Sequence, residues 1–147
     1  MLKFTKILVP LDGSENSHRA LAYASYLAGC CGASVGVLHV VNLSSKVAAI
    51  GQLGTGGYVP DGVLDELQDT GRSIIDEALA LLPSGIAAKG FVEVGRPTDK
   101  IVTFCGTNGY DLIIIGSRGL GAIEQLVLGS VSSFVLHHAS CPVMIVR

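Results

Sequence analysis

Residues 111–131 read DLIIIGSRGLGAIEQLVLGSV, and this stretch decides which fold the chain can adopt. Its first part is a short apolar run, residues 112–115, that stops at Gly116. A continuous apolar run bounded by turn residues is typical of a strand buried on both faces of a parallel sheet. Because open α/β sheets bind ligands in the loops that follow such strands, we expect a ligand site directly after this strand.

The same stretch carries two pairs of residues that suit the binding of an anion. Gly116 and Gly119 would let backbone N–H groups approach a ligand closely. After a spacer of nine residues, Gly129 and Ser130 enter a predicted helix whose N-terminus favours negative charge. We interpret these four residues together as a phosphate cradle.

The composition indicates a single globular domain over residues 1–147. The chain has 10 Lys and Arg against 12 Asp and Glu and no basic run, which argues against a nucleic-acid surface. No apolar run reaches the roughly 18 residues of a membrane span, and the first residues do not resemble a signal peptide. We therefore expect no membrane association and a cytoplasmic location.

Strand and helix patterns alternate along the chain. Strands are predicted over residues 6–10, 34–41, 87–94, 112–115 and 142–146. The first helix is predicted to begin at a cap, either Ser14 or Asp12, and to end near Gly29 and Gly32. Further helices are predicted over residues 63–82, from Pro97 onward and over 130–138. This alternation predicts an α/β fold: a doubly wound, Rossmann-like, five-stranded parallel sheet in the order 3-2-1-4-5, with helices on both faces.

Residues 42–60 interrupt this pattern and contain four closely spaced glycines. A segment of this length without periodic structure is usually a lid or is disordered in the free protein, so we predict a flexible loop here. No lysine follows the glycines in the spacing GxxxxGK[ST], which excludes a P-loop.

In the predicted strand order, the direction of winding reverses between the first and fourth strands. Ligands of such sheets bind in the crevice at this switch point. The loops that flank it are residues 10–14 and 116–130, and the end of the second strand forms a side wall. The topology therefore predicts that Asp12 lies next to the phosphate cradle.

Four sequence features resemble the universal stress protein family. They are VPLDGS at 9–14, LHVV at 38–41, the cradle GSRG at 116–119 followed by nine residues and GS, and CPV at 141–143. The resemblance covers essentially the whole chain. The cradle spacing is similar to that of the ATP-binding branch of the family. It implies binding of adenine nucleotides, a homodimer and a regulatory role in stress rather than a settled catalytic activity. Because the cradle lies beside the predicted loop 42–60, we also expect ATP to order this loop and so to alter a surface that an unidentified protein partner recognises.

The resemblance and the predicted switch point together give a set of candidate nucleotide-binding residues. They are Pro10, Asp12, Val40, Ile115, Gly116, Arg118, Gly119, Gly129, Ser130 and Val131. By resemblance, the cradle would bind ribose and phosphates, and the Val40 backbone would contact adenine. Asp12 would contact the nucleotide or help to hold Mg²⁺ through water, with no direct metal ligand.

Each of these roles has a simpler alternative. The glycines could serve tight turns, Ser130 could be an ordinary N-cap, and Asp12 could cap a helix. Val40, Ile115 and Val131 could be core residues, and Arg118 could be a solvated loop residue.

Little in the sequence supports catalysis or a metal centre. The four histidines and four cysteines lack ligand spacing, so we expect structural histidines and reduced, packed cysteines. Asp12 and Glu124 are the evident candidates for a base near the cradle. A slow ATPase or phosphate-transfer enzyme at the same site is therefore the alternative to a binding protein.

The last strand predicts how the chain assembles. Residues 143–146 are apolar and lie at a sheet edge, which is a liability unless another strand pairs with them. Pairing with a second copy across a two-fold axis would remove the open edge, so we predict a homodimer through this strand. A dimer that acts without nucleotide is a further alternative, but it is not expected to retain the cradle spacing.

Overall fold

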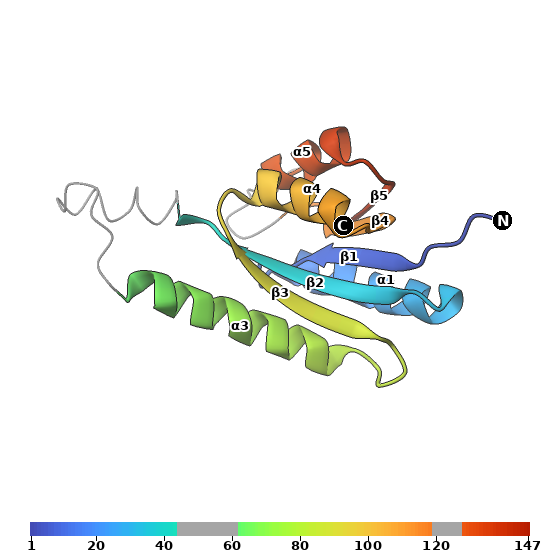
Figure 1. The fold of residues 1–147 in the computed structure, drawn as a ribbon, viewed down its shortest axis with the longest axis horizontal. Coiled ribbons are helices and arrows are strands. Elements are labelled where there is room, and N and C mark those ends of the chain that lie inside the picture. Colours follow the sequence, from blue (N-terminus) through green and yellow to red (C-terminus); the bar gives the residue numbers. More distant parts are fainter. Residues whose placement is uncertain (44–61, 119–127) are drawn as a thin grey trace.

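The structure is a computed structural model that describes residues 1–43, 62–118 and 128–147. Strands and helices alternate along the chain (Figure 1). The strands are β1 (Lys6–Pro10), β2 (Ser34–Val41), β3 (Ala88–Val94), β4 (Leu112–Gly116) and β5 (Val143–Val146). The helices are α1 (Glu15–Cys31), α3 (Val63–Leu81), α4 (Pro97–Thr107) and α5 (Ser130–His138). From residue 44 onward, the loop predicted over 42–60 lies outside the described residues and stays a prediction.

The five strands form one parallel sheet in the order β3-β2-β1-β4-β5, which confirms the predicted topology. β1 lies at the centre, where Ile7 is in register with Val35 of β2 and with Leu112 of β4. Because all pairings are parallel, the carboxyl ends of β1, β2 and β4 meet at one edge of the sheet. The winding reverses there, between β1 and β4, as the sequence predicted.

Helices cover both faces of the sheet, as predicted. α1 and α3 pack on one face over a core that includes Ile7, Ala24 and Ile75. α4 and α5 pack on the other face over a second core that includes Leu8, Ile113 and Val135 (Figure 1). The side chains of neighbouring β1 residues, such as Ile7 and Leu8, thus pack into opposite cores, as expected of a strand buried on both faces. None of the helices in the described ranges is both long and apolar enough to cross a membrane.

The ends of α1 show which of the predicted caps the chain uses. The Ser14 side chain accepts a hydrogen bond from the Ser17 N–H at 3.2 Å, so Ser14 is the N-cap and Asp12 is not. At the other end, Gly29 lies inside the helix, and Gly32 is the C-cap with a left-handed φ of 69°. Only glycine adopts that conformation without strain, which is why the helix ends at the second of the two glycines.

Candidate functional site

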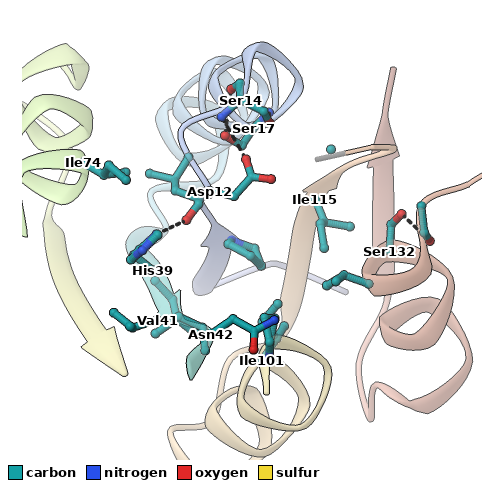
Figure 2. A pocket seen from close by; sticks show the side chains of 18 of the residues that line it. Asp12, Ser14, Ser17, His39, Val41, Asn42, Ile74, Ile101, Ile115 and Ser132 are labelled. Atoms are coloured by element: carbon teal, nitrogen blue, oxygen red, sulfur yellow. Dashed lines mark hydrogen bonds between the residues drawn. The ribbon is translucent and has the colours of Figure 1, made fainter. Parts of the chain in front are cut away.

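A cavity of 690 Å³ opens at the edge where β1, β2 and β4 end. Its wall comes from the turn after β1, the ends of β2 and β4, and parts of α3, α4 and α5 (Figure 2). The candidate residues that line it are Pro10, Asp12, Val40, Ile115, Gly116, Arg118, Gly129, Ser130 and Val131. Gly119 lies outside the described residues. Segments more than 100 residues apart in the chain therefore meet at one opening.

The turn after β1 holds Asp12 at this opening through local hydrogen bonds. Asp12 Oδ1 accepts a hydrogen bond from the backbone N–H of Ser14 at 2.9 Å, in an Asx turn. Ser14 in turn caps α1. The helix-cap alternative for Asp12 is therefore wrong in its simple form, because Asp12 orients the capping residue rather than capping the helix itself.

His39 on β2 ties this turn to the neighbouring strand. Its Nδ1 lies 2.8 Å from the carbonyl oxygen of Leu11, which fixes Nδ1 as the protonated ring nitrogen in this contact (Figure 2). The other side of the ring lies against α3 at Gly71, where a Cβ atom would come within 2.8 Å of His39 Cδ2. His39 thus connects three walls of the cavity: the turn that carries Asp12, β2 and α3.

Gly116, at the end of β4, is required by the approach of α1. A Cβ atom at this position would lie 2.9 Å from the backbone carbonyl carbon and from the Cβ of Asn16, in the first turn of α1. No side chain fits there without displacing the helix. The close approach of α1 is a sufficient reason for this glycine, whether or not a ligand binds.

The junction between β4 and α5 is organised around the carbonyl oxygen of Ser117. This oxygen accepts hydrogen bonds from the Gly129 N–H at 2.7 Å and from the Ser132 hydroxyl at 2.8 Å. The Gly129 N–H is therefore used within the protein. Gly129 is the N-cap of α5 and Ser130 is its first helical residue, so the N-cap alternative for Ser130 is wrong. Among the described residues, no side chain caps α5, and the first turn of this helix borders the cavity.

The cavity lining combines charged and polar groups with apolar side chains from β2, β4, α3, α4 and α5. Its described lining contains one guanidinium, that of Arg118, and one carboxylate, that of Asp12. Ile115 is buried in the second core, and Val40 and Val131 are partly buried against it. These three residues therefore belong to the core and also present apolar surface to the cavity, so packing and lining are compatible roles.

Asp111, which begins the stretch that predicted the site, lies at the opposite end of β4 and serves the fold. Its carboxylate accepts hydrogen bonds from the Thr5 N–H, the Thr5 hydroxyl and the Lys6 N–H at 2.9, 2.7 and 3.1 Å. Burial raises the pKa of this carboxyl, but the hydrogen bonds from Thr5 and Lys6 outweigh burial and hold the pKa below its usual value.

The histidines of the described segments all bond backbone carbonyl groups through Nδ1. His18 contacts the oxygen of Ser14, and His137 and His138 contact oxygens one turn earlier in α5. Within residues 1–43, 62–118 and 128–147, no group of three or more His, Cys, Asp or Glu residues could hold a metal ion. A direct metal site made by these residues alone therefore has no support.

Sequence reasoning missed several residues of the cavity wall. His39 lies within the predicted strand 34–41, and its contact with the Leu11 carbonyl depends on tertiary structure, which carries no local sequence signal. Ser132 lies on α5 one residue beyond the motif, and it is buried. Thr70 and Ile74 of α3 also line the cavity, and their spacing of four residues could have suggested a shared helix face.

Comparisons with known proteins agree with this architecture. The model of the universal stress protein family matches residues 3–147. Universal stress protein YxiE of Bacillus subtilis is 34% identical, with 98% of this chain and 99% of the relative covered. The structure of universal stress protein UspA from Lactobacillus plantarum superposes with a TM-score of 0.75 at 25% identity, and each chain is covered completely.

One further solved structure is a universal stress protein in complex with cAMP. It has a TM-score of 0.73 and 24% identity, and covers 99% of each chain, so this likeness concerns the fold. A doubly wound sheet in the order 3-2-1-4-5, a cavity at its switch point and a family match along nearly the whole chain all agree. This chain is a member of the universal stress protein family.

Proposed function

We propose that this chain binds an adenine nucleotide, with ATP as the principal ligand, as a single nucleotide-binding domain of residues 1–147. The proposal is carried by one observation: the switch-point cavity gathers the described cradle residues, Arg118, Asp12 and an apolar wall. Its volume of 690 Å³ lies within the roughly 300–1,000 Å³ of small-molecule sites. A lining that combines one guanidinium and one carboxylate with apolar side chains suits a ligand that carries both charge and a flat apolar group.

The phosphates would lie at the junction between β4 and α5. There the first turn of α5 receives no side-chain cap from the part of the chain that the structure describes, and Arg118 also lines the cavity. Backbone N–H groups at a helix N-terminus and a guanidinium both favour phosphate. Gly119 and the Ser130 hydroxyl complete the proposed phosphate contacts. The adenine would lie toward Val40, Ile115 and Val131, where apolar atoms face the cavity.

Mg²⁺ would accompany the phosphates through water held by Asp12. Mg²⁺ sites commonly combine one or two carboxylates with substrate phosphates and several waters. The single carboxylate of the described lining fits such a site better than a cage made only of protein ligands. When bound, the ion would neutralise phosphate charge beside the carboxylate of Asp12.

Members of this fold are known with an adenine nucleotide. The universal stress protein solved with cAMP shares the fold of this chain at 24% identity. That likeness supports the fold as a scaffold for such ligands, whereas the choice of ATP rests on the similarity of the cradle spacing to that of the ATP-binding branch and on the Arg118 guanidinium in the lining.

Release of bound ligand tests the proposal without any assumption about catalysis. Protein purified without added nucleotide is denatured by heat, and the small molecules in the supernatant are separated by ion-exchange chromatography. We expect ATP, with ADP or AMP as minor species. If no nucleotide is released and the refolded or nucleotide-free protein binds none on re-addition, the proposal is rejected.

A slow ATPase is the second candidate, because the Asp12 carboxylate borders the same cavity as the proposed phosphate site. A base there could accept a proton from an attacking water. Phosphate release in the presence of Mg²⁺ should then fall at least tenfold in an Asp12→Asn variant that still binds ATP. Equal rates in both proteins would reject hydrolysis at this site.

The proposed assembly is a homodimer that pairs β5 with its copy. β5 is an edge strand of the sheet, and its residues Val143–Val146 carry no charge. Antiparallel pairing of two edges would use the outward backbone groups of β5. In this arrangement, the nucleotide would alter a surface that a protein partner recognises during the stress response.

A further inference from the structure

Two thiols that lie 36 residues apart in the sequence are in contact on the face of the sheet that α4 and α5 cover. Sγ of Cys105, on α4, lies 3.3 Å from Sγ of Cys141, in the segment between α5 and β5. Both cysteines are free thiols, and both belong to the core between the sheet and α4 and α5. We propose that this pair is an oxidation site, at which a hydroperoxide converts the two thiols into an intramolecular disulfide.

The backbones that carry the pair are already close together. A disulfide bond is about 2.05 Å long, so the two sulfur atoms must approach by roughly 1.3 Å. A side chain at Gly106, the residue after Cys105, would lie 3.8 Å from the hydroxyl oxygen of Ser140, the residue before Cys141. The segments that carry the two cysteines therefore lie close together at this point.

The two cysteines differ in access, which sets the order of reaction. Cys141 is half-buried, whereas Cys105 is 1% exposed. Burial and the neighbouring Cys141 thiol raise the pKa of Cys105 to about 12, so Cys105 carries little thiolate. A hydroperoxide therefore reaches Cys141 first, and Cys105 is the thiol that resolves the product.

The chemistry balances with the hydroperoxide as the oxidant. The Cys141 thiolate attacks the terminal oxygen and the O–O bond breaks, which leaves a sulfenic acid on Cys141 and releases an alcohol. Cys105 Sγ then attacks the Cys141 sulfur, gives up its proton, and displaces the oxygen as water. In sum, two thiols are oxidised to one disulfide, and one hydroperoxide is reduced to an alcohol and water.

The cross-link would close a loop that contains a wall of the cavity. Between Cys105 and Cys141 the chain includes β4, the Ser117 carbonyl and α5 with its capping Gly129. The bond would tie this unit to α4. Because a disulfide removes conformational freedom from the unfolded chain, the oxidised protein is expected to resist heat better than the reduced protein. The inference does not depend on nucleotide binding.

Cys30 and Cys31 are also free thiols that a hydroperoxide can oxidise, so they are removed by substitution before the test. They are adjacent at the end of α1, and Cys30 is exposed. Neighbouring residues on a helix point in different directions, so these two are poorly placed to bridge to each other. Exposed Cys30 could however link two molecules. The experiment therefore uses the full chain with Cys30→Ser and Cys31→Ser.

Hydrogen peroxide at a small molar excess is the probe, followed by alkylation of the remaining thiols and intact-mass analysis. We expect a product that has lost two hydrogen atoms and takes up no alkyl group, with a linked peptide of Cys105 and Cys141. Its Tm should rise by about 10 °C and return to the original value with dithiothreitol. Added Cys105→Ser or Cys141→Ser substitutions should each abolish the linked peptide and the gain in Tm.

Two outcomes would overturn the proposal. In one, both cysteines stay as thiols after treatment of the folded protein with hydrogen peroxide and are then fully alkylated. In the other, Cys141 proceeds to sulfinic acid although Cys105 is present, which shows that Cys105 does not resolve it. The mass analysis of the unsubstituted pair decides between these outcomes and the disulfide even if a serine variant fails to fold.

Discussion

Gly71 lies inside α3, where glycine is about 1 kcal/mol less favourable than alanine. Its lack of a side chain admits the His39 ring, because a Cβ atom would come within 2.8 Å of His39 Cδ2 and 3.3 Å of Val92 Cγ1. We expect Gly71→Ala to lower the free energy of unfolding by about 1 kcal/mol, since the cost of overpacking exceeds the gain in helix propensity. Urea denaturation followed by circular dichroism measures this change.

Gly29 in α1 is the matched control for that substitution. It also lies inside a helix, but no described atom other than the helix's own backbone and the adjoining residues lies within 4 Å of the position of its Cβ. Gly29→Ala should therefore raise the free energy of unfolding by about 0.5–1 kcal/mol. Equal effects of the two substitutions would show that the His39 contact does not constrain α3.

Asp111 predicts a pH dependence of stability. The pKa of its carboxyl is lowered in the folded protein, so its contribution is present above the unfolded pKa of about 3.9 and is lost as the pH falls through the folded value. Asp111→Asn should cost about 1 kcal/mol at pH 7, after allowance for its partial exposure to solvent. The difference from the unsubstituted protein should shrink below pH 4, as followed by urea titrations at several pH values. A difference that stays constant from pH 7 to pH 3 contradicts this role.

At the level of elements, the turn after β1 depends on β2 through His39. Replacement by phenylalanine keeps a ring against Gly71 but leaves the Leu11 carbonyl without its donor. We expect His39→Phe to cost about 1–2 kcal/mol of stability and to weaken ATP binding several-fold, because the turn that carries Asp12 loses the His39 hydrogen bond and is then held to β2 by the bond from the Leu11 N–H to the Leu38 carbonyl oxygen. Calorimetric titration and thermal melts measure the two effects.

His39→Asn is the control, because its side-chain amide can place a donor where Nδ1 lies. It should recover most of the ATP affinity that His39→Phe loses. If both variants bind ATP equally well, the hydrogen bond to Leu11 does not position the turn.

The elements and their order could be predicted because they depend on local pattern. The buried run before Gly116, the cap at Ser14 and the alternation of strands with helices each carry their signal within a few residues. The switch point then followed from topology. The contacts of the Ser117 carbonyl and of the Cys105 thiol could not be predicted, since they join residues whose separation in the chain has no periodic signal.

At the level of the whole molecule, β5 determines whether the chain assembles. The carbonyl groups of Pro142 and Val146 accept hydrogen bonds from the N–H groups of Ile113 on β4 and of Ser117 directly after it. Alternate residues of a parallel strand bond the same neighbour, so the N–H of Ile145 points to the open edge. Ile145→Pro should remove an outward donor and convert the proposed dimer to a monomer, as measured by sedimentation at micromolar concentration.

Ile145→Ala is the matched control for that substitution, because it also shortens the side chain but keeps the N–H group. It should remain a dimer. A concentration-independent monomer for the unsubstituted protein, or a dimer that tolerates proline at 145, rules out assembly through β5.

The central claim is that the cavity where β1, β2 and β4 end holds ATP. Isothermal titration of nucleotide-free protein with ATP and Mg²⁺ tests it most directly, with Arg118→Ala and Arg72→Ala as a pair. Arg118 lines the cavity, whereas Arg72 lies on α3 outside its lining and pairs with Asp69. We predict saturable binding of one ATP per chain, weakened about tenfold by Arg118→Ala and unchanged by Arg72→Ala. The absence of saturable heat with ATP, or equal affinity in both variants, would contradict the account.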